Sequence, residues 1–399
     1  MTQQLQQSPA ATALPAPRRH VPAWHSSFYR FEQLRSAVRA GVAALLVPLT
    51  VLLVCAGAAA APPAASIADR CAPSDGLHYI CGLTASEDLV RVPATKWLIA
   101  SGMNVGAPAH LYLVDSQRKR AEPVFPADSS ALPQSFHSTM GCSGPPDLKR
   151  MSLDGLALRP GTTGRHTLYA ANHGDRMAIE LFAIDARGAQ PRLRWIDCAT
   201  LPANTLPNAV TPLARGGFLV ISFYDPTDPQ SWSRMARGQM TGRILEWQAG
   251  KGFAPLPDSA MSGGNGLETS ADGRLVYASS WSARKLVVLS LGSGSRREIP
   301  LDFMPDNIHR LPDGSLLIGG QRTTVAAVHA CTGPQCPQPW VIARVNPADG
   351  AVTVLLEGPG SPEVNYACGA LEVAGTLFVT VRGAQRIIYH SIPAASLRN

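Results

Sequence analysis

A hairpin unit that recurs along the chain constrains the fold more than any other feature of the sequence. Its clearest copy spans residues 263–280, where Asn265 lies between glycines and Asp272-Gly273 separates two short apolar runs. Asp-Gly between such runs is the strongest short-range signal for a β-hairpin. The stretch therefore predicts two antiparallel strands that begin at a polar amide.

The same layout, a polar residue followed by a strand, a turn and an apolar return strand, occurs six times. The copies follow one another at intervals of about 40 to 70 residues. Repeats of about 40 to 50 residues made of short strands are typical of propeller blades, and radial closure leaves only short strand edges. We therefore predict an all-β, six-bladed β-propeller with very little helix.

The first polar residues of the six units are expected to converge, because the innermost strand of each propeller blade runs along the central channel. They are Glu87, Asp154, Asn208, Asn265, Asp306 with Asn307, and Cys368. Single asparagines there could simply cap turns, but converging carboxylates would repel one another without a cation. Oxygen donors without a dominant imidazole or thiolate favour calcium over zinc. The pattern predicts a Ca²⁺ site on the axis.

The composition limits the classes of molecule that the protein is expected to bind. The 399 residues are 45% hydrophobic and 16% charged, with a net charge of +7. No basic run carries interleaved aromatic residues, so we expect no nucleic-acid binding. We divide the chain into a leader with a hydrophobic segment, 1–65, and a propeller, 66–399.

The apolar run within residues 40–61 follows several arginines and ends in small residues. It fits a secretory signal peptide, and it is also near the ~20 residues that a spanning helix needs. Cleaved signal and membrane tether both stay open. Either one predicts an exported propeller, periplasmic or extracellular; the sequence gives no oligomeric state.

Eight cysteines agree with export. The pairings that we consider are Cys331 with Cys336 across a short loop, Cys71 with Cys81, and Cys142 with Cys198. Cys368 is then a candidate for an unpaired thiol near the axis, or simply a small packed side chain.

A cation in the channel could polarise a carbonyl and stabilise the oxyanion that forms when water attacks. This chemistry suits hydrolysis of a small-molecule ester or lactone. A general base is needed beside the ion, and the candidates are Asp154, His173 and His309.

Five short motifs, one per blade and in order, resemble the paraoxonase/arylesterase group and, more broadly, the SMP-30/gluconolactonase propellers. They are Glu87-Asp88-Leu89, Asn172-His173, Leu206-Pro207-Asn208, Asn265-Gly266 and Asp306-Asn307-Ile308, within about residues 81–390. The resemblance implies a calcium-dependent hydrolase of lactones or aryl esters. It also implies that the catalytic calcium is held by Glu87, Asn208, Asn265, Asp306 and Asn307.

Two positions depart from the family pattern. Asp154 stands where the family has a histidine that acts as general base, whereas His173 matches the second family histidine. We predict that both are catalytic, although a carboxylate beside a divalent cation is a weak base and Asp154 could be an extra ligand. Ala209 stands where the family has an aspartate that helps Asp88 to hold a structural calcium, which leaves that second site in doubt.

Other functions stay open. The chain could be a non-catalytic propeller that keeps the ion for stability and binds a ligand or protein at the channel mouth. Carbon–carbon bond formation, as in strictosidine-synthase-like propellers, lacks a suitable glutamate. The loop from Trp232 to Arg237 is expected to be solvated surface or to line the substrate mouth.

Overall fold

The computed structural model describes residues 71–125, 136–331, 337–361 and 364–393. The predicted leader and hydrophobic segment, 1–65, lie outside these ranges. No helix within the described ranges is long and apolar enough to cross a membrane.

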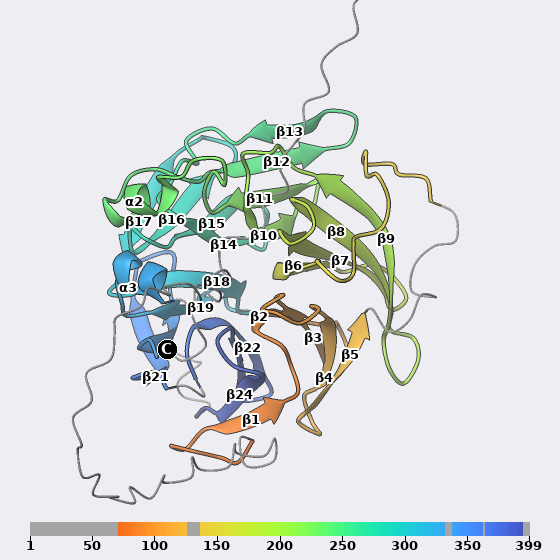
Figure 1. Ribbon diagram of the computed structural model, residues 1–399, viewed down its shortest axis with the longest axis vertical. Helices are drawn as coiled ribbons and strands as arrows, with labels where there is room; N and C mark the ends of the chain where they lie inside the picture. The colour runs from red at the N-terminus through yellow and green to blue at the C-terminus, as the bar shows by residue number, and fades with distance from the viewer. Residues whose placement is uncertain (1–70, 126–135, 332–336, 362–363, 394–399) are drawn as a thin grey trace, which may run out of the picture. The chain divides into compact units, whose positions relative to one another are not determined.

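The described chain forms six four-stranded antiparallel sheets arranged around a common centre, as Figure 1 shows. This arrangement confirms the predicted all-β, six-bladed propeller. The strands of the first three blades, from the axis outward, are β2 (Ser86–Arg91), β3 (Trp97–Gly102), β4 (Leu111–Asp115) and β5 (Arg120–Phe125); β6 (Leu153–Arg159), β7 (Arg165–Asn172), β8 (Ala178–Asp185) and β9 (Arg192–Thr200); and β10 (Pro207–Pro212), β11 (Phe218–Ser222), β12 (Ile244–Gln248) and β13 (Gly252–Pro255). Those of the last three blades are β14 (Gly264–Thr269), β15 (Leu275–Ser280), β16 (Lys285–Ser290) and β17 (Arg296–Pro300); β18 (Met304–Arg310), β19 (Leu316–Gln321), β20 (Trp340–Val345) and β21 (Val352–Gly358); and β22 (Ala367–Val373), β23 (Thr376–Val381), β24 (Arg386–Ser391) and β1 (His78–Cys81).

The sixth blade takes its outermost strand from the other end of the chain. β1 pairs antiparallel with β24, so that His78 faces Tyr389 and Cys81 faces Arg386. The hairpin pattern did not predict this pairing, because a single outer strand carries no turn signal. It closes the propeller by hydrogen bonds between strands from the first and last parts of the described chain.

Alternate residues of each strand pack toward opposite neighbouring blades, because side chains of a strand point alternately to its two faces. In β3, Ile99 packs against blade 2, whereas Leu98 and Ala100 pack against blade 6. Six buried apolar clusters lie in this way between successive blades. Each fully buried large aliphatic side chain contributes about 1.5–3 kcal/mol, so the sheets are held together mainly face to face.

The cysteine predictions are confirmed where the structure can test them. Disulfides join Cys71 to Cys81 and Cys142 to Cys198. Cys331 is also disulfide-bonded, but its predicted partner Cys336 lies outside the described residues. Cys368 is free and buried.

The segment around Trp232 is a helix where a loop was predicted, whereas the predicted solvent exposure is confirmed for Ser233, Arg234, Ala236 and Arg237. Residues expected to form a solvated loop form a short helix, α2 (Ser231–Ala236), which contacts a second short helix, α3 (Val325–Ala330). Met235 is buried, and the Trp232 ring lies 6.2 Å from that of Trp281. Apolar side chains that look exposed in a loop are therefore packed, since two helices far apart in sequence cover each other.

The innermost strands break register with their neighbours at the same place in every blade. The irregular stretches are Ser86–Leu89, Leu153–Leu156, Pro207–Ala209, Gly264–Leu267, Pro305–Ile308 and Ala367–Ala370. Each contains one of the six residues that we call the axis ring: Glu87, Asp154, Asn208, Asn265, Asp306 and Cys368. Bulges re-aim side chains and are common beside active sites. Because the inner strands of successive blades contact one another in a closed circle, the six bulges bring distant residues to one place.

Close packing at one bulge gives a testable prediction. A Cβ at Gly266 would lie 2.3 Å from the Asp306 carbonyl oxygen and 2.9 Å from the Ile308 nitrogen. We expect Gly266→Ala to destabilise the protein by about 3 kcal/mol, since backbone must move to admit the methyl group. Gly292→Ala is the control, because a Cβ there meets nothing within 4 Å. Equal urea-unfolding midpoints for the two variants would contradict the prediction.

Candidate metal centre

The axis ring is buried and compact. None of its six residues is more than 7% exposed. The ligand atoms of Glu87, Asp306 and Cys368 lie within 4.8 Å of one another. Three carboxylates, two amides and one thiol from six blades are therefore gathered around the propeller axis.

Four oxygens of the ring have no hydrogen-bond partner within the described structure. They are Asp154 Oδ1, Asn208 Oδ1, Asn265 Oδ1 and Asp306 Oδ1. A buried polar atom without a partner costs about 1–3 kcal/mol. Unpaired acceptors that gather with carboxylates fit a divalent cation, because hard cations are bound through such oxygens.

Neighbouring amides hold the ring residues in place through their other oxygens. Asn208 Nδ2 donates to Asp154 Oδ2 at 3.3 Å, and Asn307 Nδ2 donates to Glu87 Oε2 at 2.7 Å. Gln321 Nε2 donates to Asp306 Oδ2 at 2.9 Å. Asp154 and Asp306 thus each keep one oxygen tied to the protein and one free, which is the arrangement that a metal ligand needs.

Gln321 and Trp281 support the centre and were not predicted. Trp281 Nε1 donates to Gln321 Oε1 at 2.9 Å, which fixes the orientation of the amide that holds Asp306. Gln321 ends β19 directly after Gly319 and Gly320, in an apolar strand. A polar residue at the end of such a strand was the only signal available.

Burial disfavours charge on all three carboxylates of the ring, and neighbouring carboxylates add to this effect for Glu87 and Asp306. Burial raises the pKa of Glu87 well above its usual range, and the charge of Asp154 raises it further. Burial and then the charge of Glu87 raise the pKa of Asp306. Burial raises the pKa of Asp154 to about 7. The exposed guanidinium of Arg382 opposes these rises in Asp154 and Asp306, but a single cation there does not balance three carboxylates.

A histidine–carboxylate pair lies at the ring. His173 Nε2 and Asp154 Oδ2 are 2.8 Å apart and share a hydrogen bond. Burial, reinforced by the charge of Arg382, lowers the pKa of His173 to about 4, so the imidazole is neutral near pH 7. The His173 side chain is 16% exposed and that of Asp154 is 5% exposed. Of the two predicted catalytic residues, His173 is therefore the one more open to solvent.

Hydrogen-bond donors surround Asp88, at the second metal position that the sequence leaves in doubt. His309 Nε2 lies 2.7 Å from Asp88 Oδ1, which also accepts from Leu89 N at 2.8 Å. Leu156 N donates to Asp88 Oδ2 at 2.8 Å. Burial disfavours charge on His309, but Asp88 overcomes this and raises its pKa. These surroundings do not fit a structural cation at Asp88, and they engage His309 away from the role of general base.

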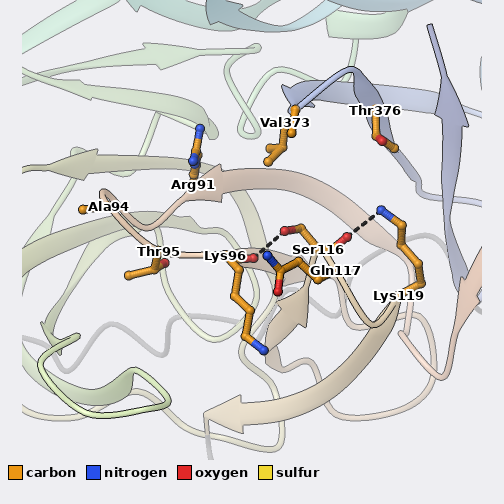
Figure 2. A pocket seen from close by; sticks show the side chains of 10 residues that line it. Arg91, Ala94, Thr95, Lys96, Ser116, Gln117, Lys119, Val373 and Thr376 are labelled. Carbon is orange, nitrogen blue, oxygen red and sulfur yellow. Dashed lines mark hydrogen bonds between the residues drawn. The ribbon is translucent and has the colours of Figure 1, made fainter.

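A separate open hollow of about 680 Å³ lies between blades 1 and 6, and Figure 2 shows Arg91, Lys96 and Lys119 around it. Arg91, which lines the hollow, is the last residue of β2, and Glu87 lies near the start of the same strand. The hollow contains no residue of the axis ring. It is therefore distinct from the candidate metal centre.

Comparisons with known proteins concern the fold. No protein-family model and no curated protein matches the chain. Similar solved structures include a gluconolactonase from Xanthomonas campestris, with 15% identity over 79% of this chain and 89% of that one and a TM-score of 0.47. The calcium-binding protein regucalcin from Agrobacterium tumefaciens shares 14% identity over 78% of this chain and 90% of its own, with a TM-score of 0.47. The PQQ-bound aldose sugar dehydrogenase from Streptomyces coelicolor shares 15% identity over 81% of this chain and 100% of its own, again with a TM-score of 0.47.

Sequence identities this low show a similar architecture and nothing more. The number of blades is taken from the six sheets of this protein. Gluconolactonase and regucalcin propellers are nevertheless among the structures that the chain resembles. The closer resemblance to paraoxonases stays a prediction.

Asn265 gives a direct test of metal binding, because its buried amide oxygen has no hydrogen-bond partner in the described structure. We expect Asn265→Ala to weaken divalent-ion binding about 10- to 100-fold, the equivalent of losing one charge-assisted contact. Without metal, the variant should be about as stable as the wild type, because the amide oxygen that it loses has no hydrogen-bond partner in the described structure. Isothermal titration with calcium measures the effect, with Asn346→Ala as the control. Unchanged affinity would remove Asn265 from the ligand set.

Proposed function

We propose that the protein is an exported, calcium-dependent hydrolase of lactones or aryl esters. The observation that carries the proposal is the set of four unpaired ring oxygens beside the Asp154–His173 pair. Glu87, Asn208, Asn265 and Asp306, with Asn307, would hold the ion. Donors of this kind suit a hard cation.

A bound divalent ion would polarise the substrate carbonyl and stabilise the oxyanion. The protein supplies the proton transfer. His173, neutral near pH 7, accepts a proton from the attacking water, while Asp154 holds the imidazole through Nε2 and stabilises its positive charge. Asn307 and Gln321 keep the carboxylates of Glu87 and Asp306 directed at the axis.

Export is supported by the cysteine chemistry. Disulfides such as Cys71–Cys81 and Cys142–Cys198 persist in oxidising compartments. The proposed location is periplasmic or extracellular, with or without a tether through residues 40–61.

The test is turnover of a panel of lactones and phenyl acetate by the purified full chain, with calcium and after chelation. Elemental analysis identifies the resident ion. We expect hydrolysis that is lost on chelation and restored by calcium. Activity that survives complete removal of metal would contradict the proposal.

One observation favours a second function, a non-catalytic propeller stabilised by its ion. Asp154 occupies the position of the family's histidine base and has an unpaired oxygen of its own, as an additional ligand would. If no substrate in the panel turns over while chelation still lowers Tm, this function replaces the first.

A further inference from the structure

Cys368 occupies the sixth position of the axis ring. Its register break, Ala367–Ala370, is equivalent to the breaks that present the five oxygen-bearing residues in the other blades. The side chain is 1% exposed and in no disulfide. Its sulfur lies within 4.8 Å of ligand oxygens of both Glu87 and Asp306.

A small packed side chain would explain burial but not this position. Asp306, which lies beside the sulfur, has an Oδ1 atom without a hydrogen-bond partner in the described structure, and the equivalent positions of three other blades carry Asp154, Asn208 and Asn265 oxygens that are also unpaired. These acceptors point independently to a bound cation. A cation that they surround would also be within reach of the sixth blade's side chain.

We propose that Cys368 is a metal ligand, and that the axis binds thiophilic divalent ions through a direct metal–sulfur bond. Thiolate ligands select ions such as Zn²⁺ and Cd²⁺, whereas calcium is bound through oxygen alone. The Cys368 thiol now lies 3.1 Å from the carbonyl oxygen of Tyr366, to which it donates. On binding, the S–H bond breaks, the metal–sulfur bond forms and the proton leaves to solvent. The inference rests on the proposed metal centre and adds that this centre also binds ions that prefer sulfur ligands.

The test uses the full chain with its disulfides intact and Cd²⁺ as the probe. We expect a sulfur-to-cadmium charge-transfer band in the ultraviolet for the wild type. The band should persist in Cys55→Ser and disappear in Cys368→Ser. Cys368→Ser should weaken Cd²⁺ binding at least about tenfold and change calcium affinity by less than about twofold. Calcium affinity also reports whether the variant is folded.

Absence of the band in the wild type, or its persistence in Cys368→Ser, would overturn the inference while leaving a calcium-dependent hydrolase intact. X-ray absorption of the Cd²⁺-loaded wild type gives the same answer without a variant, since it detects a sulfur neighbour directly. If neither calcium nor cadmium binds, the proposed metal centre itself fails.

Discussion

Replacing His173 with glutamine is expected to lower kcat about 100- to 10,000-fold, the usual contribution of a positioned general base. Glutamine can keep a hydrogen bond to Asp154 but cannot accept a proton from water near pH 7. His173 is not a member of the axis ring, so calcium affinity should stay near that of the wild type. The measurement is steady-state hydrolysis of whichever lactone or ester proves to be a substrate, with calcium titrated separately.

His78→Gln is the matched control, because His78 is exposed in β1. Asp154→Asn distinguishes two roles of Asp154. If Asp154 only orients His173, the substitution should reduce kcat alone. If Asp154 is also a metal ligand, the substitution should weaken calcium binding as well. If His173→Gln retains wild-type kcat, the imidazole is a structural group and the base must be sought elsewhere.

Removing the metal is expected to make stability fall as pH rises from about 4 to about 8. Burial raises the folded pKa of Asp154 from its ordinary 3.8 to about 7. Between these values the folded chain holds a proton that the unfolded chain has released, so stability is greatest below the lower pKa and is lost on approaching the higher one. The difference between the folded and unfolded pKa values of Asp154 corresponds to about 4 kcal/mol of stability. The raised pKa values of Glu87 and Asp306 act in the same direction.

A saturating divalent ion should remove this fall, because it lowers the pKa values of the carboxylates that bind it. Thermal unfolding of metal-free and calcium-loaded protein at several pH values measures the difference. Glu87→Gln should reduce the difference, and Asp272→Asn, in the exposed β14–β15 turn, should leave it unchanged. Parallel pH curves with and without calcium would argue against a metal centre on the axis.

The blades were predictable because their signals are local. Asp272-Gly273 predicts the turn between β14 and β15, and the structure has that hairpin. Recurrence of the unit then gave the number of blades. The convergence of Glu87 and Asp306 followed from propeller geometry alone, since more than two hundred residues separate them in the sequence.

Features that depend on partners far away in sequence could not be predicted. Nothing near His78–Cys81 indicates that this strand pairs with β24. Asp88 looks like a free carboxylate until His309 from blade 5 is placed against it. Gln321 has a role only because the bulge at Asp306 turns a carboxylate toward it. The burial of Met235 likewise depends on α3, which lies far along the chain.

The pairing of β1 with β24 also has a consequence for when the axis ring can be completed. β1 is synthesised before β24, so the sixth blade cannot be completed until β24 has been made. The axis ring takes a side chain from every blade and is therefore incomplete until the sixth blade is present. If the chain folds after export, the ion that it captures would be set by the medium in which it finishes folding.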